Sequence, residues 1–181
     1  MNIVKGWLDL AKKVASPNCN ARPEKQSINL LVIHNISLPP DQFGTPYVEQ
    51  FFQNKLNYDA HPYFETLKGL EVSSHFFIKR DGEIIQFVSC DDRAWHAGES
   101  SFCQQDNCND YSIGIELEGT DSIPYTDIQY QLLSELTSTI QQSYPMITAD
   151  RIAGHNQIAP GRKTDPGKSF DWALYIGSIT R

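Results

Sequence analysis

The chain has 181 residues, a length that fits one domain with a substantial buried core. Hydrophobic residues make up 40% of it and charged residues 20%, as in an ordinary globular protein. The net charge is -7, and binding to a nucleic-acid backbone relies on clustered Lys and Arg, so we expect no nucleic-acid partner. No apolar stretch approaches the length of a membrane span, so we expect no membrane association.

Charged residues within residues 1–16 interrupt any apolar core of a secretory signal. We therefore expect that the protein is not exported and that this segment forms a short helix packed on the domain. Residues 17–27 are polar and turn-rich, and we interpret them as a connector. Four cysteines could form two disulfides in an oxidising compartment, but without export we expect reduced thiols. Their spacing matches no zinc-binding pattern; they are Cys19, Cys90, Cys103 and Cys108.

The first strongly patterned segment is residues 28–33, a short, β-branched and almost wholly apolar run. Such a run predicts a strand buried on both faces, and His34 follows at its end. Farther along, Thr45 and Pro46 predict the start of a helix that has Thr45 as its N-cap and runs from Pro46 to about Asn54. Three apolar side chains of this helix are expected to face inward: Val48, Phe51 and Phe52.

Residues 74–88 predict a β-hairpin, because two β-rich runs flank Asp81-Gly82. We interpret His75, within the first strand, and His61, which precedes a proline, as structural residues. The loop at residues 91–98 then places Trp95 next to His96. A large aromatic side chain on a loop either forms a wall of a binding site or caps the core, and both interpretations stay open for Trp95.

Residues 111–119 predict a second strand with strict alternation of apolar and polar side chains. One face would carry Ile113, Ile115 and Leu117, and the other Gly114, Glu116 and Glu118. A carboxylate on a central strand is costly without a partner, so Glu116 either faces solvent or points into a site. A helix capped by Thr126 or Asp127 and running through Gln142 has a core face made of Leu132, Leu133, Leu136 and Ile140. A short helix begins at Asp171. We find no repeat and therefore no second domain.

The stretch 154–167 has the pattern of half a metal site. His155 follows a short apolar run, and a loop rich in Pro and Gly then brings Lys163 and Asp165 two residues apart. Residues i and i+2 of an extended chain lie on one side. Imidazole and carboxylate are zinc ligands, and a catalytic zinc takes three protein ligands and keeps one position for water. His34 is the best candidate for the third ligand, although a single histidine is more often structural.

Five segments of the chain form one ordered pattern: His34-Asn35, Ser74-His75-Phe76 before Arg80-Asp81-Gly82, Arg93–Gly98, Ser112–Leu117, and Gly154-His155 followed by Lys163–Gly167. Together they resemble the N-acetylmuramoyl-L-alanine amidases of the peptidoglycan-recognition type. The resemblance spans roughly residues 28–176, and residues 109–120 look most like the cytoplasmic branch of that family, the AmpD amidases of cell-wall recycling.

This resemblance implies a single α/β (α+β) domain over residues 1–181, with a core at 28–176 and a central mixed β-sheet flanked by helices. It implies one zinc ion held by His34, His155 and Asp165. It further implies a cytoplasmic, monomeric bacterial enzyme that cuts the amide between the lactyl group of 1,6-anhydro-N-acetylmuramic acid and L-alanine. Such an enzyme recycles peptidoglycan and thereby affects β-lactamase induction that responds to muropeptides.

The resemblance also implies the roles of the surrounding side chains. Glu116 would be the general base and Lys163 would stabilise the oxyanion. Relatives often have a tyrosine where this chain has Ser74, which leaves Glu116 as the proton acceptor. For the substrate we expect Asn35 to bind the peptide backbone, Trp95 to form an apolar wall and Arg162 to pair with a stem-peptide carboxylate. His96 is a fourth candidate contact.

Two other classes of function are compatible with these residues. Some peptidoglycan-recognition domains bind cell-wall fragments without cutting them, but they typically lack a metal ligand, and this chain keeps all three candidates together with Glu116. Two histidines and one carboxylate also describe the iron site of non-haem oxygenases. A nearby glutamate and lysine favour hydrolysis over that alternative.

Overall fold

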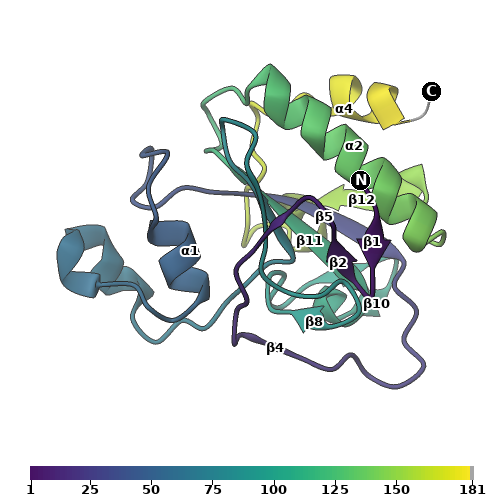
Figure 1. Cartoon of the computed structure of the whole chain (residues 1–181), viewed down its shortest axis with the longest axis horizontal. Coiled ribbons are helices and arrows are strands. Elements are labelled where there is room, and N and C mark those ends of the chain that lie inside the picture. The colour runs from purple at the N-terminus through teal and green to yellow at the C-terminus, as the bar shows by residue number, and fades with distance from the viewer. Residues whose placement is uncertain (180–181) are drawn as a thin grey trace.

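A six-stranded mixed sheet lies at the centre of the computed structural model, which describes residues 1–179 (Figure 1). All neighbouring strands run parallel except β6 and β7, which form the predicted hairpin around Asp81-Gly82. The expected single α/β domain with a central mixed sheet is therefore confirmed. In spatial order the strands are β12 (Ile152–Gly154), β5 (Leu30–Ile36), β11 (Ser112–Glu118), β6 (Phe76–Ile78), β7 (Ile84–Gln86) and β3 (Lys12–Lys13).

Shorter elements surround this sheet. Three antiparallel pairs of two-residue strands are β1 (Ile3–Val4) with β2 (Trp7–Leu8), β4 (Cys19–Asn20) with β8 (Arg93–Ala94), and β9 (Ser101–Phe102) with β10 (Gln105–Asp106). The α-helices are α1 (Tyr47–Phe52), α2 (Asp127–Ser143), α3 (His155–Ile158) and α4 (Trp172–Ile179). The 3-10 helices are η1 (Tyr58–Ala60), η2 (Pro62–Leu67), η3 (Cys108–Asp110) and η4 (Ala149–Arg151). Among residues 1–179, no helix has both the length and the hydropathy needed to cross a membrane.

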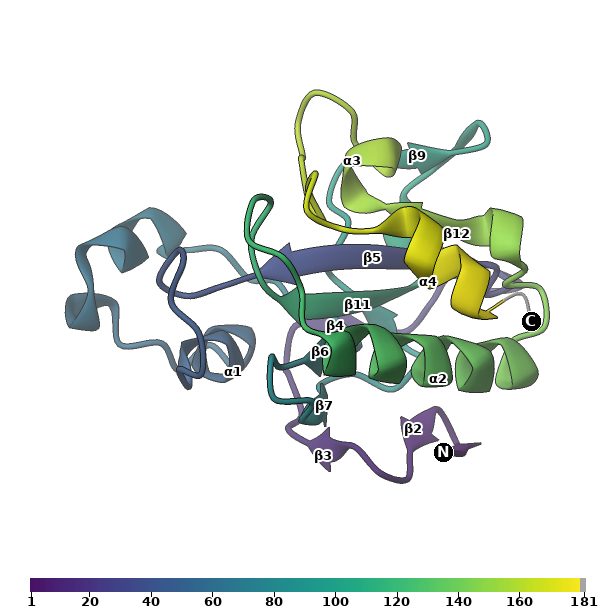
Figure 2. The same cartoon turned by 90° about the horizontal axis from the view of Figure 1, so that it is seen from above.

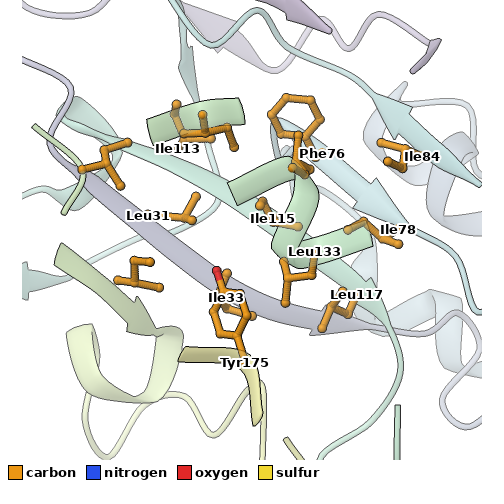
Figure 3. Close-up of a cluster of buried hydrophobic side chains, with 14 of the residues drawn as sticks. Leu31, Ile33, Phe76, Ile78, Ile84, Ile113, Ile115, Leu117, Leu133 and Tyr175 are labelled. Atoms are coloured by element: carbon orange, nitrogen blue, oxygen red, sulfur yellow. The ribbon is translucent and has the colours of Figure 1, made fainter. Parts of the chain in front are cut away.

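One face of the two central strands forms the main core. Apolar residues of β5 and β11 pack there against α2 and α4, including Leu133 of α2 and Tyr175 of α4 (Figure 3). Each fully buried aliphatic side chain contributes about 1.5–3 kcal/mol relative to its exposed state. The strand residues on this face are Leu31, Ile33, Ile113, Ile115 and Leu117. The predicted alternation along β11 is confirmed.

The long helix α2 begins at one of the two predicted caps, Thr126 or Asp127. Thr126 is the N-cap, and it forms a capping box with Gln129, in which each side chain binds the backbone N–H of the other residue. The helix ends at Ser143, one residue beyond the predicted end, and Leu133, Leu136 and Ile140 are buried as expected. Within residues 1–179 all four cysteines are free.

The N-terminal segment contradicts the prediction of a helix. Residues 1–16 form strands β1 and β2, joined through Lys5 and Gly6, and then β3 at the edge of the main sheet. Lys5 and Gly6 both have positive φ, at 50° and 73°, which a right-handed helix does not allow. A Cβ on Gly6 would lie 2.1 Å from Ser89 Oγ, so the turn also needs the missing side chain.

The start of α1 differs from the prediction as well. Pro46, not Thr45, is the N-cap, and the Thr45 hydroxyl donates to the carbonyl oxygen of Leu38 at 2.6 Å. Val48, Phe51 and Phe52 are buried as expected, in a second apolar cluster with Phe64. In Figure 2, α1, η1 and η2 lie beyond the carboxyl end of β5, which places this cluster beside the strand end that carries His34.

Candidate active site

The parallel register of the two central strands places His34 beside Glu116. His34 does not end its strand as the sequence suggested, because β5 continues to Ile36, and the Cα partner of His34 in β11 is Glu116. Residues in register on adjacent strands point to the same face of a sheet. Both side chains are buried on the face opposite the main core, where His34 is 1% exposed and Glu116 is 8% exposed.

His155 and Asp165 reach the same place from the neighbouring strand. β12 pairs with β5 and ends at Gly154, so that His155, the first residue of α3, stands at the edge of the site. The following loop returns to this point, because the backbone N–H of Asn156 donates to the carbonyl oxygen of Asp165 at 2.9 Å. His155 is buried, and Asp165 is partly buried.

Three candidate ligand atoms converge there. His34 Nδ1 lies 3.0 Å from His155 Nδ1 and 3.1 Å from Asp165 Oδ2, and His155 Nδ1 lies 3.0 Å from the same oxygen. In a tetrahedral zinc site with bonds of about 2.0–2.1 Å, the ligand atoms stand about 3.3 Å apart. The triangle formed by these atoms therefore fits one face of a zinc tetrahedron and leaves the fourth direction free of protein ligands from this set.

The contacts of the ring nitrogens support the same conclusion. His155 Nε2 lies 3.1 Å from the carbonyl oxygen of Ala97, which can only accept, so Nε2 carries the proton. In the neutral ring this leaves Nδ1 as a bare acceptor facing the carboxylate of Asp165. Acceptors face one another here, an arrangement that a cation stabilises.

Burial controls the protonation of the two central-strand residues. It lowers the pKa of His34 to about 4, so the ring is neutral at pH 7, as a metal ligand must be. Burial, followed by the nearby Asp165, raises the pKa of Glu116 well above its ordinary value, and Lys163 opposes this effect. Among residues 1–179, Glu116 Oε2 has no hydrogen-bond partner. A buried carboxyl group of this kind suits proton transfer to a ligand in the site.

A family comparison agrees with this geometry. The family model described as N-acetylmuramoyl-L-alanine amidase matches residues 24–168. The chain belongs to this family. It is 53% identical over 178 residues to the 1,6-anhydro-N-acetylmuramyl-L-alanine amidase AmpD of Haemophilus influenzae, a match that covers 98% of this chain and 97% of the relative.

Solved structures extend the comparison with the amidase family. A crystal structure of a selenomethionine derivative of AmpD superposes with a TM-score of 0.96 at 51% identity, and 99% of each chain is covered. The Escherichia coli amidase AmiD, solved with anhydro-N-acetylmuramic acid-L-Ala-D-γ-Glu-L-Lys, superposes with a TM-score of 0.60 at 29% identity. That match covers 87% of this chain and 60% of AmiD.

The amidase site opens into a cleft of about 580 Å³. Asn35, His96, Arg162 and Lys163 line it together with Glu116. The Asn35 amide donates to Asp121 Oδ1 at 2.9 Å, and Asp121 also lines the cleft. The Arg162 guanidinium donates to the carbonyl oxygens of Ala97 and Glu99, so it contacts the same carbonyl group as His155.

Trp95 lies elsewhere. It is not among the residues that line the cleft, and its indole Nε1 donates to Asn20 Oδ1 at 2.7 Å. Its half-buried side chain thus ties the loop of residues 91–98 to β4. This placement gives no support to an apolar wall at Trp95.

The apolar part of the cleft comes from a segment that the sequence did not single out. Tyr63 of η2 and Leu70 are exposed large side chains on the wall of the cleft, 38% and 49% exposed. They adjoin buried residues of the second cluster: Leu38, Phe51, Phe52 and Leu67. No local motif marks these residues; their unusual exposure is visible only once the fold is known.

Proposed function

We propose that this protein is a zinc-dependent amidase that hydrolyses the bond between the lactyl group of 1,6-anhydro-N-acetylmuramic acid and the L-alanine of the stem peptide. The observation that carries the proposal is the convergence of His34, His155 and Asp165 beside the buried Glu116 at the base of an open cleft. The names of relatives that are 50% or more identical over nearly the whole chain support the choice of substrate.

One zinc ion would be held by His34 Nδ1, His155 Nδ1 and one carboxylate oxygen of Asp165. When bound, zinc supplies Lewis-acid chemistry, which lowers the pKa of a water molecule and polarises the amide carbonyl. The hydrogen bond from His155 Nε2 to Ala97 keeps its ligand nitrogen free of a proton, as expected for a ligand supported from the opposite side of the ring.

Glu116 acts as general base and then as general acid. Its unpartnered Oε2 takes a proton from the attacking water and later gives it to the nitrogen of the departing L-alanine. Its raised pKa brings the carboxyl group closer to neutral pH, where both transfers are efficient. Such a group typically contributes about a hundred- to ten-thousand-fold to the rate.

Lys163 stabilises the negative charge that develops on the amide oxygen. Its exposed side chain lines the cleft and its charge lowers the pKa of Glu116, and both observations support this role. Asn35 at the end of β5 binds the peptide, and Arg162 and His96 hold the walls of the cleft. We place this activity in the bacterial cytoplasm, in a monomer whose amidase unit is residues 28–176, acting on fragments released during wall turnover.

Mass spectrometry of products tests the proposal. Purified protein is incubated with anhydro-muropeptide and, in parallel, with the same muropeptide carrying a reduced sugar end. We expect free stem peptide from the anhydro substrate, a much slower release from the reduced one, and no release after chelation until zinc is restored.

Metal analysis of the same sample should give about one zinc per chain. Tight binding of the anhydro substrate without release of peptide would point instead to a binding protein. Activity that returns only with iron and an oxidisable cosubstrate would point to an oxygenase. Either result would overturn the proposed hydrolase.

A further inference from the structure

A chain of buried hydrogen-bonding groups leads from the backbone of η3 to His34. Ser112 Oγ lies 2.5 Å from the carbonyl oxygen of Cys108, and His96 Nε2 lies 3.1 Å from Ser112 Oγ. His96 Nδ1 in turn lies 2.9 Å from His34 Nε2. Ser112 is 0% exposed, His96 8% and His34 1%, so bulk water does not compete for their hydrogen bonds.

The direction of every bond in this chain follows from its anchored end. A carbonyl oxygen can only accept, so the Ser112 hydroxyl uses its one hydrogen on Cys108. Ser112 Oγ must then accept from His96 Nε2. The ring of His96 is buried, and neither of its two hydrogen-bond partners, Ser112 Oγ and His34 Nε2, is a carboxylate that would hold a second proton on it. With its single proton on Nε2, His96 Nδ1 is bare and accepts from His34 Nε2.

We infer that Ser112 and His96 are positioning residues that hold His34 in the tautomer whose Nδ1 is free to bind a metal. His34 Nδ1 is the atom that faces His155 and Asp165. The opposite tautomer would present a proton where the metal–nitrogen bond has to form. The inference deepens the proposed function, on which it rests for the identity of the metal, and it moves His96 from substrate contact to the support of a ligand.

The packing around His96 holds the ring in the orientation that this chain needs. A Cβ on Gly114 would lie 2.6 Å from His96 Cγ, so the ring occupies the space left by the missing side chain. The backbone N–H of His96 donates to Asn109 Oδ1 at 3.0 Å, and so does that of Ala97 at 2.8 Å. Ring and backbone are thus both held, and rotation of the imidazole about its bonds is restricted.

Nuclear magnetic resonance of metal-free protein with ¹⁵N-labelled histidine tests the tautomer directly. We expect a protonated Nε2 and a bare Nδ1 in both His34 and His96, assigned with His34→Gln and His96→Gln samples. A proton on Nδ1 of His34 in the wild-type protein would overturn the inference. This readout needs no substrate and no folded variant beyond those used for assignment.

A pair of serine variants separates tautomer control from ordinary packing. Ser112→Ala removes the acceptor of His96 Nε2, and zinc affinity in competition with a chelator should fall about 10- to 100-fold. Ser74→Ala removes an equally buried hydroxyl, which donates to the Gly114 carbonyl at 2.8 Å, and zinc affinity should stay within about twofold. Equal losses of affinity in the two variants would mean a packing effect alone and would contradict the inference.

Failure of this inference and failure of the proposed function are distinguishable. If wild-type protein releases peptide but His34 carries its proton on Nδ1, the tautomer inference fails and the amidase proposal stands. If the tautomers and zinc affinities behave as expected but no amide is cut, the amidase proposal fails alone.

Discussion

The seven residues of strand β11 alternate between two faces that have opposite chemical characters. One face carries Ile113, Ile115 and Leu117 and packs on α2, while the other carries Ser112, Gly114, Glu116 and Glu118 and points toward the site. Every residue of the strand is buried. Burial on the apolar face is favourable in itself, whereas each buried polar group on the opposite face costs free energy unless it is partnered.

Three of the four polar-face positions are accommodated by specific contacts. Ser112 binds Cys108 and His96, Gly114 leaves space for a ring, and Glu118 accepts from the backbone N–H groups of Gly44 and Arg80. Of these four positions, only Glu116 has a buried oxygen without a hydrogen-bond partner among residues 1–179. The favourable burial of the apolar face therefore offsets the free-energy cost of the unpartnered Glu116 carboxyl group on the opposite face. Functional sites commonly contain one such unfavourable group.

Glu116→Gln gives the largest expected effect and is the sharpest test of this contrast. The amide keeps the shape of the side chain but cannot act as a base, so peptide release should fall about 100- to 10,000-fold. Zinc content should be unchanged, and the unfolding free energy should not decrease, because a buried group of unfavourable charge has become neutral.

Glu118→Gln is the matched control, two residues along on the same face. The amide keeps one acceptor oxygen and replaces the other with an NH2 donor, so either the Gly44 or the Arg80 backbone N–H loses its acceptor. The unfolding free energy should therefore fall, while activity changes by less than about tenfold. If mass spectrometry shows that Glu116→Gln releases peptide at the wild-type rate, Glu116 is not the base.

Ile115→Ala tests the apolar face. The side chain is fully buried in the main core, so we expect a loss of about 2–5 kcal/mol in unfolding free energy, measured by urea denaturation. Zinc affinity at a temperature where the variant remains folded should be close to that of the wild type. A loss of zinc affinity as large as the loss of stability would show that the two faces are not separable.

Gly114→Ala introduces a methyl group on the polar face of β11. Its Cβ would overlap the ring of His96, so we expect a loss of about 1–3 kcal/mol in unfolding free energy from overpacking. In contrast to Ile115→Ala, it should also weaken zinc binding, because the support of His34 is displaced. Unchanged zinc affinity in calorimetric titration would show that His96 can move without consequence.

His75, whose ring binds the backbone of β11 at Gly114, makes the unfolding free energy depend on pH. Its ring accepts from the Gly114 N–H, and burial, followed by the charge of Arg22, lowers its pKa to about 3. Because the folded pKa is depressed below the unfolded value of about 6.5, stability is fully present above about pH 6.5 and is lost as pH falls toward 3. Each pH unit in that window costs about 1.4 kcal/mol for this histidine.

His75→Asn should flatten the pH dependence. The amide oxygen of asparagine can replace Nδ1 as acceptor, and the group does not titrate. Between pH 6.5 and pH 5 the variant should lose about 2 kcal/mol less unfolding free energy than the wild type, both metal-free. Equal losses of unfolding free energy in the two proteins over this pH range would contradict the lowered pKa of His75.

Much of the scaffold could be predicted because its signals are local. The alternation along residues 111–119, the hairpin at Asp81-Gly82 and a helix cap at Thr126 or Asp127 each depend on neighbouring residues. The structure contains the alternation, the hairpin and the cap at Thr126. The candidate ligands could be proposed because the chain has only five histidines, and two of them, His34 and His155, directly follow short apolar runs. Their meeting at one point is a fact of the sheet order, which places β5 between β12 and β11.

The sequence by itself determined the alternation of the central strands, the hairpin, the cap of α2 and the residue types available for a metal site. Only the tertiary structure decided that residues 1–16 contain strands, that Trp95 binds Asn20, and that His96 contacts His34. The physical reason is the distance along the chain over which each signal acts. Periodicity and caps act over a few residues, whereas an edge pairing, a cleft wall or a bond between rings depends on segments brought together by the whole chain.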